Sequence, residues 1–239
     1  MTYRNPKLTN DSASALTIRN TLSVTFEEEF NTKLKFGATV YATNEAQCHL
    51  LGVGQPEAIV PLEPFNNPLG VVLSQTMHHV PDTLYQSLWS NNTFVGGELY
   101  KNRGKYVFYG FGGEVCLLGR KIGQFNVHGH VDAGFRLGKD SMTISAEADL
   151  RNVTPDFYHL NYNSNHYQWY NDFKKPYVFH VAGRLAYPTK WVQTQLGVDY
   201  ENLTNHIYFG PQGTPIQSEE NISIIAANLQ LNLITPWVN

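Results

Sequence analysis

A short string of metal-binding residue types, His128-Gly129-His130-Val131-Asp132, is the strongest candidate for chemistry in this sequence. Residues at positions i, i+2 and i+4 of a strand project from one face, as a metal site built on a strand requires. Zinc hydrolases, however, carry such a string in a loop or at a strand end, with further ligands nearby. Here the string lies in the middle of a long two-faced run. We therefore predict a polar wall at this string, with no metal site and no cofactor.

Three consecutive carboxylates, Glu27, Glu28 and Glu29, resemble an acidic catalytic cluster. The alternation of their predicted strand separates them, because Glu27 and Glu29 point to the polar side. Glu28 falls on the apolar side near a strand end, where the cost of a charge at a membrane interface is small. No serine lies in a nucleophile elbow, and no glycine-rich phosphate loop leads from a strand into a helix. The sequence therefore predicts a protein that is not an enzyme.

The segment from Phe157 to Phe173 is dense in aromatic side chains, with asparagines between them. Aromatic faces combined with amide donors suit the stacking and hydrogen bonding of sugars. The alternative is a loop that folds against itself or into the mouth of a barrel, since long ordered loops often pack their own side chains. On the first interpretation, the ligand-binding residues are Tyr162, His166, Tyr167, Trp169 and Tyr170.

The elements that carry these residues are predicted to be long strands. From Phe125 to Leu137 the odd positions are all non-polar, whereas the even positions are polar or glycine. Successive side chains of a strand point to opposite faces, so this segment is a two-faced strand. It is longer than the five or six residues common in soluble domains, and it is long enough for a tilted membrane strand, which needs about 9 to 11 residues.

The same alternation recurs along the whole chain and predicts about nine long strands with no convincing helix. The fold class is therefore all-β, an antiparallel transmembrane β-barrel, and residues 1–239 form a single barrel domain or a fragment of one. The predicted strands cover about residues 22–30, 34–42, 86–100, 105–118, 125–137, 142–150, 177–187, 192–201 and 225–233.

The connections between the predicted strands differ in length. Long loops are expected at about 45–85, 153–175 and 203–220, and short turns alternate with them along the chain. The connection around Arg120-Lys121 is the one short exception on the side of the long loops. Short turns on one side and long loops on the other are typical of outer-membrane barrels, whose periplasmic turns are short.

The composition excludes several other classes of protein. The net charge is only -3, so no basic surface indicates a nucleic-acid partner. Charged residues make up 15% of the chain, which is low against a typical share of about 25%. No run of about 18 apolar residues is present to form a transmembrane helix. The two cysteines, Cys48 and Cys116, do not make a disulfide framework.

Two loop motifs point to a known family. The first is Ser164-Asn165-His166-Tyr167-Gln168-Trp169-Tyr170-Asn171-Asp172-Phe173, which a predicted strand follows. The second is Asn205-His206-Ile207-Tyr208-Phe209, with Pro215-Ile216-Gln217 soon after. With the hairpins between these motifs, residues 86–234 resemble the putative porin family of Bacteroidetes outer membranes. The resemblance implies an outer-membrane barrel considerably longer than this chain, and it brings no catalytic residues.

The number of predicted strands and the first residues of the chain indicate how much of a barrel the sequence contains. Bacterial single-chain barrels have even numbers of strands, and their export needs a signal peptide. The first residues of this chain lack the apolar core of such a signal, and the predicted strand number is odd. We therefore expect an internal piece of a larger barrel, with open edges at its first and last strands that need partners in lipid.

These patterns predict an outer-membrane channel for passive diffusion of small hydrophilic solutes, surrounded by the lipid bilayer and compatible with a homo-oligomer. Two alternatives stay open: the barrel of a gated transporter, and a soluble or surface β-rich carbohydrate-binding protein. Acidic residues outnumber arginines among the predicted pore-lining side chains, so a weak preference for cations is expected. The predicted pore-lining residues are Glu27, Glu29, Glu98, Glu114, His128, His130, Asp132, Arg136, Glu147, Asp149, His180, Arg184, Asp199 and Glu201.

Overall fold

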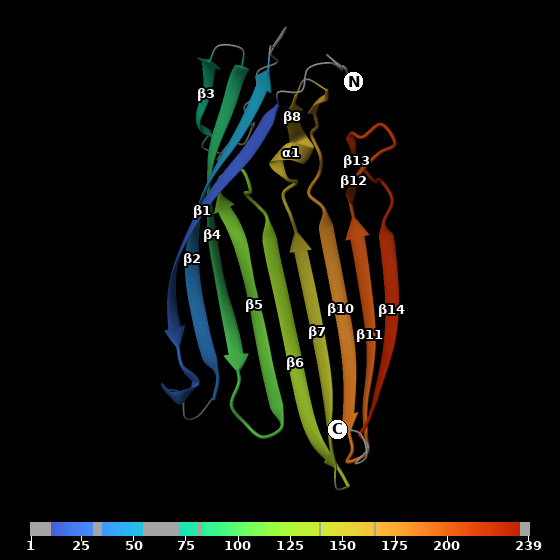
Figure 1. The fold of residues 1–239 in the computed structure, drawn as a ribbon. Coiled ribbons are helices and arrows are strands. Elements are labelled where there is room, and N and C mark those ends of the chain that lie inside the picture. Colours follow the sequence, from blue (N-terminus) through green and yellow to red (C-terminus); the bar gives the residue numbers. More distant parts are fainter. Residues whose placement is uncertain are drawn as a thin grey trace.

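The fold is a large, open, antiparallel β-sheet with compact loops at one end (Figure 1). The computed structural model describes residues 11–30, 35–54, 72–80, 83–138, 140–164 and 166–234. No helix in this part of the chain is long and apolar enough to cross a membrane. The long strands are β1 (Ser12–Phe26), β2 (Gly37–Gly54), β3 (Val72–Val80), β4 (Thr83–Lys101), β5 (Val107–Leu118), β6 (Phe125–Leu137), β7 (Asp140–Asn152), β10 (Tyr177–Pro188), β11 (Val192–Thr204) and β14 (Ile222–Leu233).

Nine of these strands follow one another through the sheet in the order β1-β2-β4-β5-β6-β7-β10-β11-β14. Every pairing is antiparallel, and β3 pairs with the upper part of β4 beyond the end of β5. The predicted all-β fold with about nine long antiparallel strands is confirmed. The sheet does not close on itself, so β1 and β14 are the two ends of this nine-strand path within the described residues.

The register carries the sequence alternation from strand to strand, so that the sheet has one polar and one apolar face. His128 on β6 pairs with Asp149 on β7, and Asp149 pairs with His180 on β10. Directly paired residues of antiparallel strands share a face. A shift of one residue anywhere would exchange the two faces, so the continuous alternation specifies the register.

The polar face is the concave one. Arg19 on β1 lies 3.4 Å from Glu114 on β5, although the residue of β1 level with Glu114 is Ser23. On a flat sheet the two Cα atoms would be separated by about 14 Å across the strands and about 13 Å along β1. Their side chains do not span that distance, so the sheet must curl toward its polar face. This curvature is that of a barrel wall with a polar lumen.

The apolar face is bare rather than packed into a core. Ile225 is 76% exposed, Leu229 is 63% exposed and Val127 is 54% exposed. The buried apolar cluster of the described residues is small and lies at the loop end, where Phe157 packs on Leu51 and Leu88. A two-layer soluble β-protein buries the apolar face of its sheet. Among the described residues, no second layer packs on that face of the sheet.

Short turns and longer connections lie at opposite ends of the sheet, as the sequence predicts (Figure 1). The predicted loop at about 45–85 is nevertheless wrong at both ends. Residues 45–54 complete β2, residues 72–80 form β3, and β4 begins at Thr83. Residues 55–71 and 81–82 lie outside the described residues.

The alternation of polar and apolar residues is lost in these segments because β2 and β4 extend beyond the part of the sheet that has an apolar face. Asn44 and Asn91 share the apolar side of β2 and β4, and their side chains bond to each other at 2.7 Å. The part of a strand that extends beyond the hydrocarbon of a bilayer does not need an apolar face. Hydrophobic alternation therefore cannot show where such a strand ends. The other two predicted loops also contain short elements: α1 (Phe157–Leu160), β8 (Asn161–Asn163) and β9 (Gln168–Tyr170), then β12 (Ile207–Phe209) and β13 (Pro215–Gln217).

The first predicted strand also ends earlier than expected. β1 stops at Phe26, and residues Glu28–Phe30 form a short 3-10 helix. Glu28, which we expected on the apolar face of a strand, is buried instead, and its carboxylate accepts hydrogen bonds from the backbone N–H groups of Asn102 and Arg103. Glu29 forms an ion pair with Arg103. These carboxylates therefore tie two short turns together, and Glu27 and Glu29 are not on a strand.

Candidate pore wall and mouth

The polar face gathers most of the predicted pore-lining side chains. Glu27 and Glu29 lie beyond the end of β1, whereas the register places all the others on the one concave face. The residues on this polar wall are Glu98, Glu114, His128, His130, Asp132, Arg136, Glu147, Asp149, His180, Arg184, Asp199 and Glu201.

Ion pairs link neighbouring strands across the polar wall. Arg184 of β10 donates to Glu147 of β7 at 2.9 Å. Nε2 of His180 on β10 lies 3.8 Å from Oδ1 of Asp199 on β11, and this contact is an ion pair only when the imidazole is protonated. The two members of each pair keep substantial exposure, so these contacts contribute little to stability and leave the charges available to ions in water.

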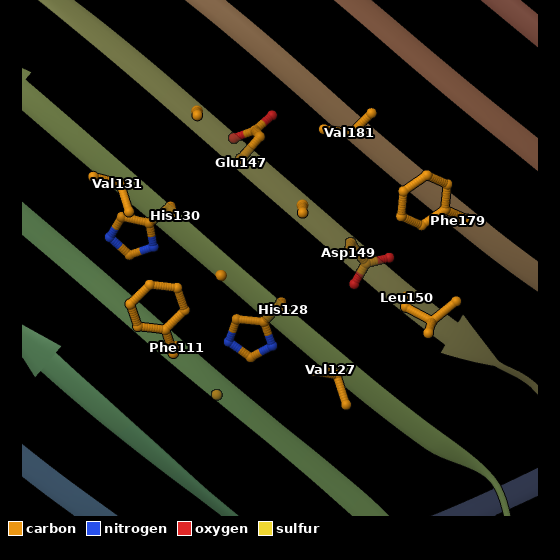
Figure 2. Close-up of a pocket in the computed structure, with 14 residues that line it drawn as sticks. Phe111, Val127, His128, His130, Val131, Glu147, Asp149, Leu150, Phe179 and Val181 are labelled. Atoms are coloured by element: carbon orange, nitrogen blue, oxygen red, sulfur yellow. The ribbon is translucent and has the colours of Figure 1, made fainter.

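Two imidazoles lie along the wall rather than standing upright from it (Figure 2). A Cβ atom placed on Gly110 of β5 would lie 2.5 Å from Cε1 of His130, and one placed on Gly112 would lie 2.9 Å from Nε2 of His128. The glycines of β5 thus leave room for the rings that β6 carries, as ring-over-glycine pairs do in other sheets. Both histidines remain exposed.

A hollow of about 420 Å³ lies in the region drawn in Figure 2. Its side chains come mainly from the apolar face, with small residues such as Gly129 and Ala148 between Phe111 and Phe179. It faces away from the polar wall and holds few polar groups. We therefore assign it to the outer surface of the sheet and not to a binding site for hydrophilic solutes.

The turn between β5 and β6 bends over the polar wall at the loop end. Asn92 of β4 is fully buried and accepts a hydrogen bond of 3.0 Å from the backbone N–H of Lys121. The ammonium of Lys121 lies 2.8 Å from Glu45 of β2, to which Asn92 also donates. Since Glu45 and Asn92 are paired residues of the polar wall, the turn crosses the concave side.

The connection between β7 and β10 covers the neighbouring part of the mouth. Phe157 of α1 stacks on His49 of β2 with ring centroids 4.3 Å apart, and Tyr158 donates to the carbonyl of Ser14 on β1 at 2.7 Å. The guanidinium of Arg120 lies 5.4 Å from the ring centroid of Phe157. Burial lowers the pKa of Arg120 to about 10, which leaves it charged at neutral pH.

Comparison with known proteins agrees with this geometry. Residues 1–237 match the family described as "Putative porin", which covers nearly the whole chain. The chain belongs to this porin family. Membership implies a porin-like role in the outer membrane, as the resemblance in the loop motifs led us to expect. No curated protein and no solved structure matches the sequence.

In this porin, the predicted ligand residues pack mainly against one another. Tyr162 and Trp169 pair across β8 and β9, and their rings stack with centroids 4.7 Å apart. The indole N–H of Trp169 donates to the carbonyl of Tyr158 at 2.9 Å. The ring centroids of Tyr167 and Trp169 are 6.2 Å apart. Tyr170 stays exposed. The aromatic segment thus folds onto itself and onto the mouth of the sheet, and sugar binding there stays a prediction.

Hydrogen bonds join the porin's two long connections into one cap. The amide of Gln217 bonds to both backbone groups of Lys174, donating at 2.7 Å and accepting at 2.9 Å. Asn205 donates to the carbonyl of Lys175 at 3.2 Å. Phe209 of β12 reaches Trp169 of β9, with ring centroids 6.4 Å apart. The cap is therefore an ordered structure with its own contacts.

Sequence reasoning missed five charged groups of the wall and mouth: Arg19, Glu45, Arg120, Lys121 and Arg151. Arg19 could have been found, because it alternates with Leu16 and Ile18 once β1 is extended toward its start. No pattern marks the Lys121–Glu45 pair, which joins a turn to a distant strand. Among the described residues, no group of three or more His, Cys, Asp or Glu side chains could hold a metal ion.

Proposed function

We propose that this chain forms part of the wall of an outer-membrane channel, through which small hydrophilic solutes diffuse passively. The observation that carries the proposal is the two-sided sheet: a bare apolar face and a concave face lined by charged and amide side chains. Exposed apolar surface of this extent needs a covering, and the acyl chains of a bilayer supply it without a protein partner.

The apolar runs fit the thickness of a bilayer. On the apolar side they extend from Met142 to Leu150 on β7, from Val192 to Tyr200 on β11 and from Ile225 to Leu233 on β14. A tilted strand needs about 9 to 11 residues to cross the hydrocarbon. A soluble carbohydrate-binding protein would leave these runs in water, so the membrane channel is favoured over that alternative.

The wall charges favour a weak preference for cations. Carboxylates outnumber guanidinium groups on the concave face, and a low-dielectric wall strengthens the field along an aqueous path. Arg19 and Arg184 each neutralise one carboxylate, Glu114 and Glu147 respectively, which keeps the preference weak. The inward turn and the cap narrow the entrance, so the solutes are expected to be small.

Planar bilayers test the proposal directly. We expect the full-length protein, purified in detergent, to produce discrete conductance steps, and a KCl gradient to give a reversal potential on the cation-selective side. Heat-denatured protein in the same detergent is the control. A protein that stays in solution without detergent and gives no conductance would contradict the channel, whereas anion selectivity would contradict only the assigned wall charges.

A further inference from the structure

Imidazoles and carboxylates alternate in a row across four neighbouring strands of the polar wall. His128 of β6 is level with Asp149 of β7, which is level with His180 of β10. His180 is in turn level with Glu201 of β11. The row therefore runs at right angles to the strands and forms a short arc around the concave side.

A second row lies directly beside the first. His130 is level with Glu147, and Ala182 of β10 joins Glu147 to Asp199. Glu147 and Asp149 stand next to the two histidines of β6, on the adjacent strand β7 (Figure 2). Three histidines thus share one band of the wall: His128, His130 and His180.

Other charged groups face this band from every strand packed around it. Their balance at neutral pH is negative, because the carboxylates outnumber the guanidinium groups. The charged groups on the concave face of the neighbouring strands are Glu98, Glu114, Asp132, Arg136, Glu147, Asp149, Arg151, Arg184, Asp199 and Glu201.

The three histidines are accessible to water and protons. His128 and His130 are exposed on the concave side, and the side chain of His180 is 27% exposed beside Asp199. Histidine gains its charge between about pH 8 and pH 5, where carboxylates remain largely ionised. Acidification therefore adds positive charge to a wall whose negative charge stays nearly constant.

We infer that His128, His130 and His180 are selectivity-determining residues, whose protonation weakens or reverses the cation preference of the channel in acidic solution. This inference rests on the proposed channel function. The three side chains lie close together in one band of the wall, so their charges act jointly on the ions that pass it. Negative wall potential attracts cations at pH 8, and the protonated imidazoles offset it at lower pH.

The test is the ratio of K⁺ to Cl⁻ permeability, measured from reversal potentials of the full-length protein in a KCl gradient. Between pH 8 and pH 5.5 we expect the ratio to fall by about twofold or more. In the variant H128Q/H130Q/H180Q, the permeability ratio at pH 5.5 should equal the ratio at pH 8. Each single variant should remove part of the shift, which preserves the test if the triple variant folds poorly.

The matched control is H159Q/H206Q, since these two histidines lie in the cap, outside the band. It should show the same shift as the unaltered protein. A permeability ratio that does not change with pH, or a shift that survives in the triple variant, would overturn the inference. Absence of conductance at both pH values would instead count against the channel function itself.

Discussion

Single residues hold the β5–β6 turn in its place over the wall. Gly119 has a φ of +103°, which L side chains rarely adopt. A Cβ at this position would overlap the carbonyl oxygen of Asn91 and lie 2.6 Å from Oδ1 of Asn92. The turn can approach β4 this closely only because residue 119 has no side chain.

Exchange of Gly119 for alanine should therefore loosen the turn. We expect Gly119→Ala to lower the free energy of unfolding by about 1–3 kcal/mol, through the left-handed φ and the overlap with β4. Urea unfolding in detergent, followed by tryptophan fluorescence, measures this change. Gly183→Ala is the control, because a Cβ there meets nothing within 4 Å. Equal stability of the two variants would contradict the close approach of the turn.

The ion pair of the same turn makes a second prediction. Glu45 and Lys121 have side chains only 8% and 20% exposed, so Lys121→Met would leave a buried carboxylate without its cation, with the amide of Asn92 still donating to it. We expect a loss of about 2–3 kcal/mol in urea unfolding, and substantial recovery in the double variant K121M/E45Q. Arg184→Met removes an exposed partner and should cost less than about 1 kcal/mol. A double variant no more stable than K121M would refute the pairing.

At the scale of elements, sequence alternation predicted the centres of the strands and their polar side. His128, Glu147 and Asp199 lie on the concave face as the pattern required. The pattern did not predict where strands end. β2 runs to Gly54 because it leaves the apolar belt and keeps pairing with β4, an interaction that hydrophobic alternation does not record. The sequence pattern could not predict the inward turn at Lys121 either, because that turn depends on contacts between segments distant in the sequence.

Because each strand has one apolar and one polar side, an arginine should affect stability very differently at two adjacent positions of the same strand. Leu196 lies near the middle of the apolar run of β11, whereas Gln195 faces the concave side. We expect Leu196→Arg to destabilise the protein in lipid by about 2–4 kcal/mol, and Gln195→Arg to change stability little. Unfolding by urea in phospholipid vesicles compares the two variants. Equal effects at both positions would mean that the apolar face does not contact hydrocarbon.

At the scale of the whole molecule, the direction of the edge strands constrains the complete barrel. β1 and β14 both run from the loop end to the turn end, because they are the first and ninth strands of an antiparallel path (Figure 1). Direct pairing of the two edges would be parallel. Antiparallel closure therefore needs an odd number of additional strands, which gives an even total, as in other bacterial barrels.

Hydrogen exchange can test whether the edges are covered in the membrane. An edge amide in lipid without a partner costs several kcal/mol, so the edges must be paired there. In vesicles, we expect the amides of Ile222–Leu233 in the full-length protein to exchange as slowly as those of Tyr177–Pro188, an inner strand. Rapid exchange along one side of β14 in the membrane would contradict closure by further strands.

The rings that lie along the wall have a consequence for the bore of the channel. His128 and His130 rest on positions of β5 that have no side chain, and Asn228 likewise approaches Gly197. In the proposed channel, the water path would therefore be wider than the sizes of its lining residues imply. A methyl group at Gly110 would tilt the ring of His130 away from β5, so glycines that do not themselves face a passing ion would set the aperture of that channel.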